Sequence, residues 1–199
     1  MSLDHAILGF LREQAMSGYD LKNVCFDRDA RHFWTADQAQ VYRTLDRLER
    51  RGLVTARRER QRSRPDRRVY SITRAGEREL DAWVASPLPL PPLRDPFLIQ
   101  LRFAAELSGA DLASLLSARR AELQQRLDAL RARAAAAPPA SGRVATLDRL
   151  TLEAAMSDAR ASIDWLDDAL ETLPDAEAAP AAISPRYHLT PRPATEGST

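Results

Sequence analysis

Four polar side chains in a predicted helix at residues 36–51 have the types and spacing needed to read nucleic-acid bases. Val41, Leu45 and Leu48 repeat at helical spacing, so a helix that buries them turns its opposite face to solvent. That face carries Gln38, Gln40, Arg43 and Arg47. Glutamine pairs bidentately with adenine, and arginine with guanine, in a major groove that is wide enough for a helix. A solvated helix face without a partner is the alternative explanation.

A dense run of basic residues continues directly beyond this helix. Between Arg43 and Arg68 the chain has eleven arginines and four acidic residues, a net charge of +7. Residues 1–86 carry +4, whereas residues 87–199 carry −3. Seven arginines fall in a predicted hairpin, namely Arg57, Arg58, Arg60, Arg62, Arg64, Arg67 and Arg68. Such residues are placed to contact phosphates or to enter a minor groove, and a solvent-exposed loop is the alternative.

The elements that must position these side chains follow from apolar periodicity and capping residues. Helices are expected at residues 3–14, 18–27 and 36–51, then a hairpin with strands near 53–54 and 69–72, then a helix at 74–84. Ser17, Thr35 and Thr73 are suitable N-caps, and Gly52 is a suitable C-terminal glycine. This order of elements predicts a winged helix-turn-helix.

The second half of the chain has a different composition. The run PLPLPPL at residues 87–93 predicts an extended connector, because successive prolines cannot sustain a helix. Helices with leucine stripes are expected beyond it, from about Phe97, from Ser108 or Asp111, and over 144–173. Two long helices enclose too little core on their own, so a second copy of the chain is expected to cover their apolar faces.

The predicted fold class is therefore mainly α with a small β-hairpin, an N-terminal winged helix-turn-helix followed by a C-terminal helical dimerisation domain. The expected divisions are a DNA-binding domain at 1–86, a Pro-rich linker at 87–96, a helical dimerisation domain at 97–173 and a disordered tail at 174–199. The tail is rich in Pro, Ala, Ser and Thr and shows no periodicity.

Several classes of function lack the residues that they would need. The chain has one cysteine, Cys25, and three scattered histidines, His5, His32 and His188, so no metal site is expected. It has no Gly-rich phosphate loop and no nucleophile beside a recognisable base, so neither an enzyme nor a cofactor is expected. The absence of a long apolar run and of a signal peptide indicates a cytoplasmic protein with no membrane partner. Cys25 itself suits either a buried small hydrophobe or a redox switch.

Four segments together resemble the PadR family of transcriptional regulators. The first two helices carry ILGFLREQAMSGYDLK, and the third carries FWTADQAQVYRTLDRLERRGLV. The wing and the fourth helix carry RPDRRVYSITRAGERELDAW, and LRDPFLIQLRF follows the prolines. The resemblance covers about residues 1–107 by motif and extends to about 173 by helical layout.

The resemblance implies a homodimer that binds an inverted-repeat operator in double-stranded DNA, commonly as a repressor released by a small aromatic or drug-like effector. It places Tyr19, Gln38, Gln40, Tyr42 and Arg43 where the family meets DNA, and Arg64, Arg67 and Arg68 on the wing. The alternative is a protein-interaction module whose winged helix has lost DNA binding. Such a module would have no need for the helix glutamines and the wing arginines together.

An effector pocket is expected among aromatic residues, as in ligand-binding members of that family. Six of them could line a pocket between the two domains or across the dimer: Phe33, Trp34, Trp83, Phe97, Phe103 and Trp165. Helically spaced aromatic residues are also typical of an ordinary core, and this interpretation stays open.

Overall fold

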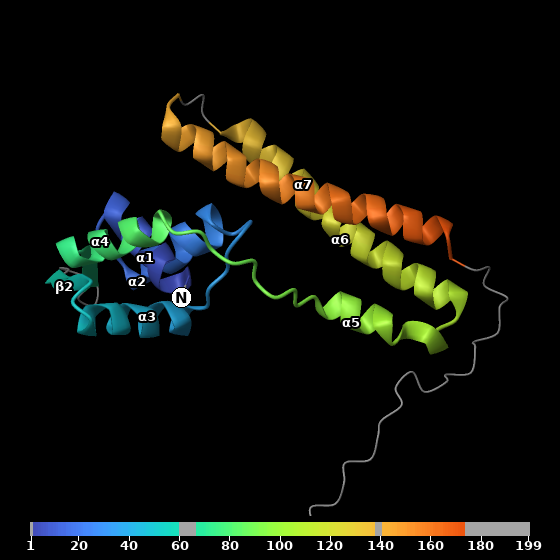
Figure 1. Ribbon diagram of the computed structural model, residues 1–199, viewed down its shortest axis with the longest axis horizontal. Coiled ribbons are helices and arrows are strands. Elements are labelled where there is room, and N and C mark those ends of the chain that lie inside the picture. Colours follow the sequence, from blue (N-terminus) through green and yellow to red (C-terminus); the bar gives the residue numbers. More distant parts are fainter. Residues whose placement is uncertain (1, 60–66, 138–140, 174–199) are drawn as a thin grey trace, which may run out of the picture. The chain divides into compact units, whose positions relative to one another are not determined.

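The computed structural model describes residues 2–59, 67–137 and 141–173 (Figure 1). The described chain is mainly helical with one small antiparallel sheet, which confirms the predicted fold class. The predicted disordered tail at 174–199 and three of the predicted wing arginines, Arg60, Arg62 and Arg64, lie outside the described residues. No helix in the described part of the chain is both long enough and apolar enough to cross a membrane.

The chain divides into two compact units. The first comprises residues 1–91 and 130–156, and the second residues 92–129 and 157–199. Helices α6 (Gly109–Ala136) and α7 (Arg143–Glu171) each run through both units. The units therefore do not correspond one to one to the predicted domains, whose boundaries stay predictions.

The first unit contains the predicted series of helices and strands. Its elements are α1 (Ser2–Glu13), β1 (Met16–Ser17), α2 (Gly18–Asp20), η1 (Leu21–Asp29), α3 (Gln38–Arg50), β2 (Val54–Glu59), β3 (Arg67–Ile72) and α4 (Arg74–Val84). Their shared core includes Ile7, Leu21, Val41, Leu45 and Tyr70, none more than 1% exposed. Core side chains thus come from both the helices and the sheet.

Two local features differ from the sequence-based expectation. The second helix was expected to be α-helical to about residue 27, but only three residues are, and η1 continues as a π-helix whose last turn closes with Ala30 N donating to Cys25 O at 2.7 Å. The third helix was expected to start after Thr35, but its N-cap is Asp37, whose carboxylate accepts from Gln40 N at 2.7 Å. Gln40 returns the contact by accepting from Asp37 N at 3.1 Å, which completes a capping box.

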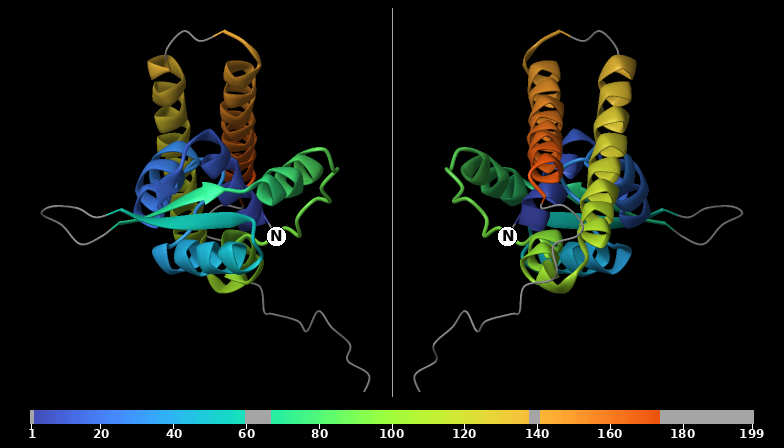
Figure 2. Two further views of the ribbon diagram at one scale, coloured as in Figure 1. Left: turned by 90° about the vertical axis from the view of Figure 1, so that its left-hand side faces the viewer. Right: turned by 90° about the vertical axis from the view of Figure 1, so that its right-hand side faces the viewer.

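The sheet has three strands in the order β1-β3-β2, all antiparallel. The strand β1 was not expected, because two residues are too few to show any periodicity. In the predicted hairpin, Val54 lies opposite Ile72 and Glu59 lies opposite Arg67. Figure 2 shows this β2–β3 ribbon beside α3.

Turn residues between α3 and α4 hold the ribbon in place as expected. Gly52 follows α3 with a φ of 69°, a conformation that disfavours side chains with a Cβ. Thr73 caps α4 by accepting from Gly76 N at 3.1 Å, and its hydroxyl also donates to Gly52 O at 2.8 Å. A Cβ on Gly76 would lie 2.2 Å from Leu53 O, so α4 approaches the start of β2 too closely for any other residue.

The second unit is built around α5 (Pro96–Arg102), a single 3-10 turn at Ala104–Glu106, and the parts of α6 and α7 that fall within it. Asp95 caps α5 by accepting from Phe97 N at 2.9 Å. The leucine stripes are partly buried here, through Leu116, Leu123 and Leu166 among others. Arg120 on α6 forms a bidentate ion pair with Asp167 on α7, which lowers the pKa of that carboxyl through the hydrogen bond.

Candidate nucleic-acid interface and cavities

Helix α3 presents one apolar and one polar face. Val41, Leu45 and Leu48 are fully buried, whereas Gln38 and Arg43 lie on the exposed face. Within the described chain, neither Gln38 nor Arg43 has a side-chain hydrogen bond or an ion pair. Both side chains are thus available to a ligand in solvent.

The other helix residues predicted to meet DNA have contacts of their own. The side-chain oxygen of Gln40 belongs to the capping box, which leaves its amide group as the free donor. Arg47 donates to Asp4, a carboxylate that is only 2% exposed, and also to Thr44 Oγ1 at 3.2 Å. The hydrogen bond to Asp4 raises the pKa of Arg47. This engagement favours a structural role for Arg47.

Two tyrosines border the polar face where α2 meets α3. Tyr19 is 64% exposed and Tyr42 is 38% exposed. Gly18 lies against the ring of Tyr42, since a Cβ there would come within 2.7 Å of Tyr42 Cε1. Close packing at this glycine therefore holds α2 against the exposed end of α3.

Two arginines at the base of the wing, Arg67 and Arg68, are paired with acids of the helices. Arg67 on β3 donates to the carboxylate of Asp20, which also accepts from Ser17 N at 3.0 Å. Arg68 pairs with Glu49 on α3 and lies 5.2 Å above the ring of Tyr70. The hydrogen bond to Glu49 raises the pKa of Arg68. Both arginines lie beside α2 and α3, but each would have to exchange an internal acid for a phosphate.

The six aromatic residues predicted to form an effector pocket have different surroundings in the two units. Trp34 packs against the core of the first unit, and Trp83 stacks on His5 with ring centroids 4.7 Å apart. Phe97 and Trp165 border a cavity of about 560 Å³ in the second unit, where their rings meet edge to face. Phe103 is 75% exposed. Phe33 borders a cavity in the first unit.

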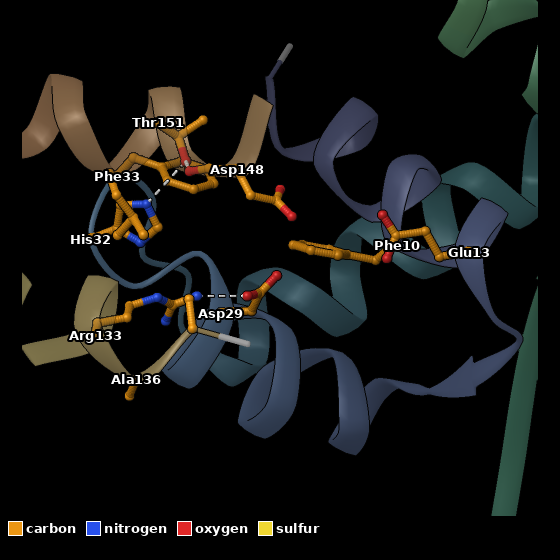
Figure 3. A pocket seen from close by; sticks show the side chains of 11 residues that line it. Phe10, Glu13, Asp29, His32, Phe33, Arg133, Ala136, Asp148 and Thr151 are labelled. Atoms are coloured by element: carbon orange, nitrogen blue, oxygen red, sulfur yellow. Dashed lines mark hydrogen bonds and ion pairs between the residues drawn. The ribbon is translucent and has the colours of Figure 1, made fainter. Parts of the chain in front are cut away.

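That cavity in the first unit has a volume of about 500 Å³ and a mixed lining (Figure 3). Its aromatic side chains are Phe10 and Phe33, and its charged or titratable side chains are Glu13, Asp29, His32, Arg133 and Asp148. Asp29 accepts from Arg133 Nη2 at 2.7 Å. Burial, then Asp29 and Asp148, raise the pKa of Glu13.

Sequence reasoning missed these charged residues. They are spread over more than 130 positions in four helices and one loop, and none has a motif-like spacing. Only the tertiary packing of α6 and α7 residues in the first unit brings them to one cavity.

Comparison with known proteins gives matches along most of the chain. The family model described as transcriptional regulator PadR-like family matches residues 7–82, and the model described as virulence activator alpha C-term matches residues 93–174. The probable transcriptional regulator Rv1176c of Mycobacterium tuberculosis is 40% identical over 186 residues, which cover 87% of this chain and 98% of that protein.

Two solved structures of one regulator resemble the structure closely. Bacillus subtilis PadR in complex with operator DNA superposes with a TM-score of 0.76 at 26% identity, covering 87% of this chain and 100% of that one. The same protein in complex with p-coumaric acid gives a TM-score of 0.72 at 26% identity, covering 87% and 99%.

Proposed function

Because the chain belongs to the PadR-like family of transcriptional regulators, we propose that it is a homodimeric repressor that binds an inverted-repeat operator through α3 and the β2–β3 wing. It acts in the cytoplasm, where that DNA lies. One observation carries the proposal: α3 is held by its buried face, while Gln38 and Arg43 have no partner among the described residues and lie on the opposite face beside a basic ribbon.

The exposed side chains differ in the groups of DNA that each can bind. Arg43 donates two hydrogen bonds to a guanine edge, and Gln38 pairs with adenine in the major groove. The free amide of Gln40 adds a donor beside them. Tyr19 and Tyr42 reach phosphates with their hydroxyl groups and so position the helix.

The wing arginines supply affinity rather than base recognition. Arg67 and Arg68, together with the sequence-predicted Arg62 and Arg64, contact phosphates beside the groove that α3 enters. Arg67 and Arg68 exchange Asp20 and Glu49 for phosphate when DNA binds. Part of the free energy of those new contacts is therefore spent on breaking internal ion pairs, and we assign Arg47 no contact because Asp4 holds it.

The apolar surface of the second unit supports the proposed dimer. Leu93, Ile99 and Phe103 are 83%, 63% and 75% exposed, and side chains of this kind gathered on one short segment mark an interface. A second copy covers them and sets two α3 helices about one DNA turn apart, roughly 34 Å, as an inverted-repeat operator demands.

Repression is supported by a relative that is 31% identical over 129 residues, covering 70% of its own length, the negative transcriptional regulator PadR of Bacillus subtilis. A small-molecule effector is supported by the complex of Bacillus subtilis PadR with p-coumaric acid. We infer that an aromatic or drug-like molecule lowers the affinity of this chain for its operator by binding one of two dimer states more tightly.

The test is binding to the DNA upstream of its own gene across a salt series, followed by fluorescence anisotropy. The variant Gln40→Ala/Arg43→Ala should lose sequence-selective binding. The control Arg160→Ala removes an arginine that is exposed on α7 and lies outside the first unit, and it should bind as the wild type does. Weak, unselective binding by all three proteins would reject the proposal and favour a protein-interaction module instead.

A further inference from the structure

Asp46 is an acid on the exposed face of α3. Arg43 lies three residues before it and Arg50 four residues after it, so the three side chains share one face of the helix. All three residues are exposed, and the side chain of Asp46 is 58% exposed. Phosphates attract the two arginines but repel the carboxylate between them. If this face meets DNA, Asp46 therefore requires a partner other than phosphate.

The contacts of Asp46 leave its carboxylate open to a hydrogen-bond donor. Its ion-pair partner is Arg68 on the wing ribbon beside α3 (Figure 2), whose Nη1 lies 3.7 Å from Oδ1. The short hydrogen bond of that guanidinium goes to Glu49 instead. Among the described residues no hydrogen bond ends on the Asp46 carboxylate, and no ion pair joins it to Arg43, although their spacing would allow one. Both charges on the exposed face are thus available to a ligand.

Binding of DNA takes Arg68 away from this acid. In the function proposed above, on which this inference rests, Arg68 leaves Glu49 for a phosphate. Asp46 then enters the major groove without the cation that accompanies it in the free protein. A carboxylate that loses water without gaining a donor is costly. The base pair that Asp46 meets must therefore supply the donor.

The donors on the major-groove edge of DNA limit what Asp46 can bind. Cytosine N4 and adenine N6 are the amino groups there, whereas guanine N7 and O6 and thymine O4 are acceptors that repel a carboxylate. The adenine amino group has the acceptor N7 beside it, so a carboxylate fits cytosine better. Three residues of helix rise about 4.5 Å, and base pairs are about 3.4 Å apart. This cytosine is therefore expected within one or two base pairs of the guanine that Arg43 binds.

We propose that Asp46 determines which operator is bound, by accepting a hydrogen bond from the N4 amino group of a cytosine in each half-site. The same carboxylate rejects guanine or thymine in that place, because their acceptor atoms would leave it unpaired and repelled. Arg43 thus supplies attraction to its guanine, and Asp46 supplies discrimination at a neighbouring base pair.

The test selects preferred sequences from a random double-stranded DNA library with the full chain and three variants. The wild type should enrich an inverted repeat that has this cytosine in each half-site. Asp46→Ala should tolerate every base there, and Asp46→Asn should prefer adenine, because an asparagine amide pairs bidentately with adenine N6 and N7. The matched control Asp81→Asn also removes an exposed acid from an ion pair with an arginine, here Arg12 on α1, and it should enrich the wild-type sequence.

Fluorescence anisotropy on the enriched operator then measures the discrimination. Replacing the cytosine by thymine should weaken binding of the wild type about tenfold, as loss of one base contact would, and should leave binding of Asp46→Ala unchanged. Equal selectivity of Asp46→Ala and the wild type at every position would overturn the proposal, and so would a relaxed position that holds a base other than cytosine. Failure of the wild type to enrich any sequence would instead reject the proposed function, and this inference with it.

Discussion

Replacing Arg47 by alanine should destabilise the fold, although the residue lies on the helix that is proposed to read DNA. Asp4 is only 2% exposed, and Arg47 donates to it from both Nε and Nη2. Arg51 Nη1 is its other ion-pair partner, at 3.4 Å. The substitution leaves a buried carboxylate with one longer contact.

The size of the destabilisation depends on how far water can screen the charge of Asp4 once Arg47 is removed. A buried charge that loses its partner costs about 3–5 kcal/mol. The Arg47 side chain is 38% exposed and Arg51 stays in place, so solvent screening and the remaining ion pair reduce that cost. We expect Arg47→Ala to lower the free energy of unfolding by about 2 kcal/mol, and the control Arg43→Ala to change it by less than about 0.5 kcal/mol.

Urea unfolding followed by circular dichroism measures both variants, and a double-mutant cycle with Asp4→Ala isolates the pair. The double variant should lose less than the two single variants combined, because it removes the unpaired buried charge. If Arg47→Ala unfolds at the wild-type urea concentration while losing operator binding, the pairing with Asp4 is incidental and Arg47 belongs to the DNA-reading face after all.

Three further predictions address the packing, the cavity and the thiol. Gly76→Ala should lower the melting temperature strongly, at a cost of about 2 kcal/mol or more, because its Cβ would meet the backbone oxygen of Leu53 at 2.2 Å. The control Gly9→Ala has open space on α1 and should instead stabilise the protein by about 0.5–1 kcal/mol. Equal melting temperatures for the two variants would contradict this packing. Because the pKa of Glu13 is raised in the folded state, the folded protein loses stability as the pH rises from the ordinary pKa of glutamate toward the raised pKa. Glu13→Gln should therefore be more stable than the wild type in urea at pH 7 and no more stable at pH 3. Burial, followed by nearby acids, raises the pKa of Cys25 to about 11, so Ellman's reagent at pH 8 should label it only in the unfolded protein; rapid labelling of the native protein would support the redox-switch interpretation.

Local capping chemistry was readable from the sequence only where it was unambiguous. Thr73 and Gly52 have no competitors nearby, and both act as expected. At the start of α3 two overlapping capping patterns are present, Thr35 with Gln38 and Asp37 with Gln40. The structure uses the second, and nothing in the local sequence excludes the first.

The π-helical segment and the charged cavity had no comparable local signal. A π-helix differs from an α-helix by one residue per turn, and a single segment such as Leu21–Asp29 is too short to show that difference in its apolar pattern. Glu13 and Asp148 are 135 positions apart and meet at one cavity only through tertiary packing. Apolar periodicity predicts which face of a helix is buried, but not which distant charges that burial brings together.

The charge of +7 between Arg43 and Arg68 overstates the number of arginines that are free to bind DNA. Arg47 neutralises Asp4, Arg67 neutralises Asp20, and Arg68 neutralises Glu49. A cation that already has an internal partner contributes to DNA affinity only the difference between a phosphate and that partner, whereas an unpaired one contributes the whole interaction. Within the part of the chain that the structure describes, Arg43 is such an unpaired cation, and it lies on the face that would enter the major groove. Local charge density therefore indicates where a polyanion binds, and the internal ion pairs decide which arginines hold it.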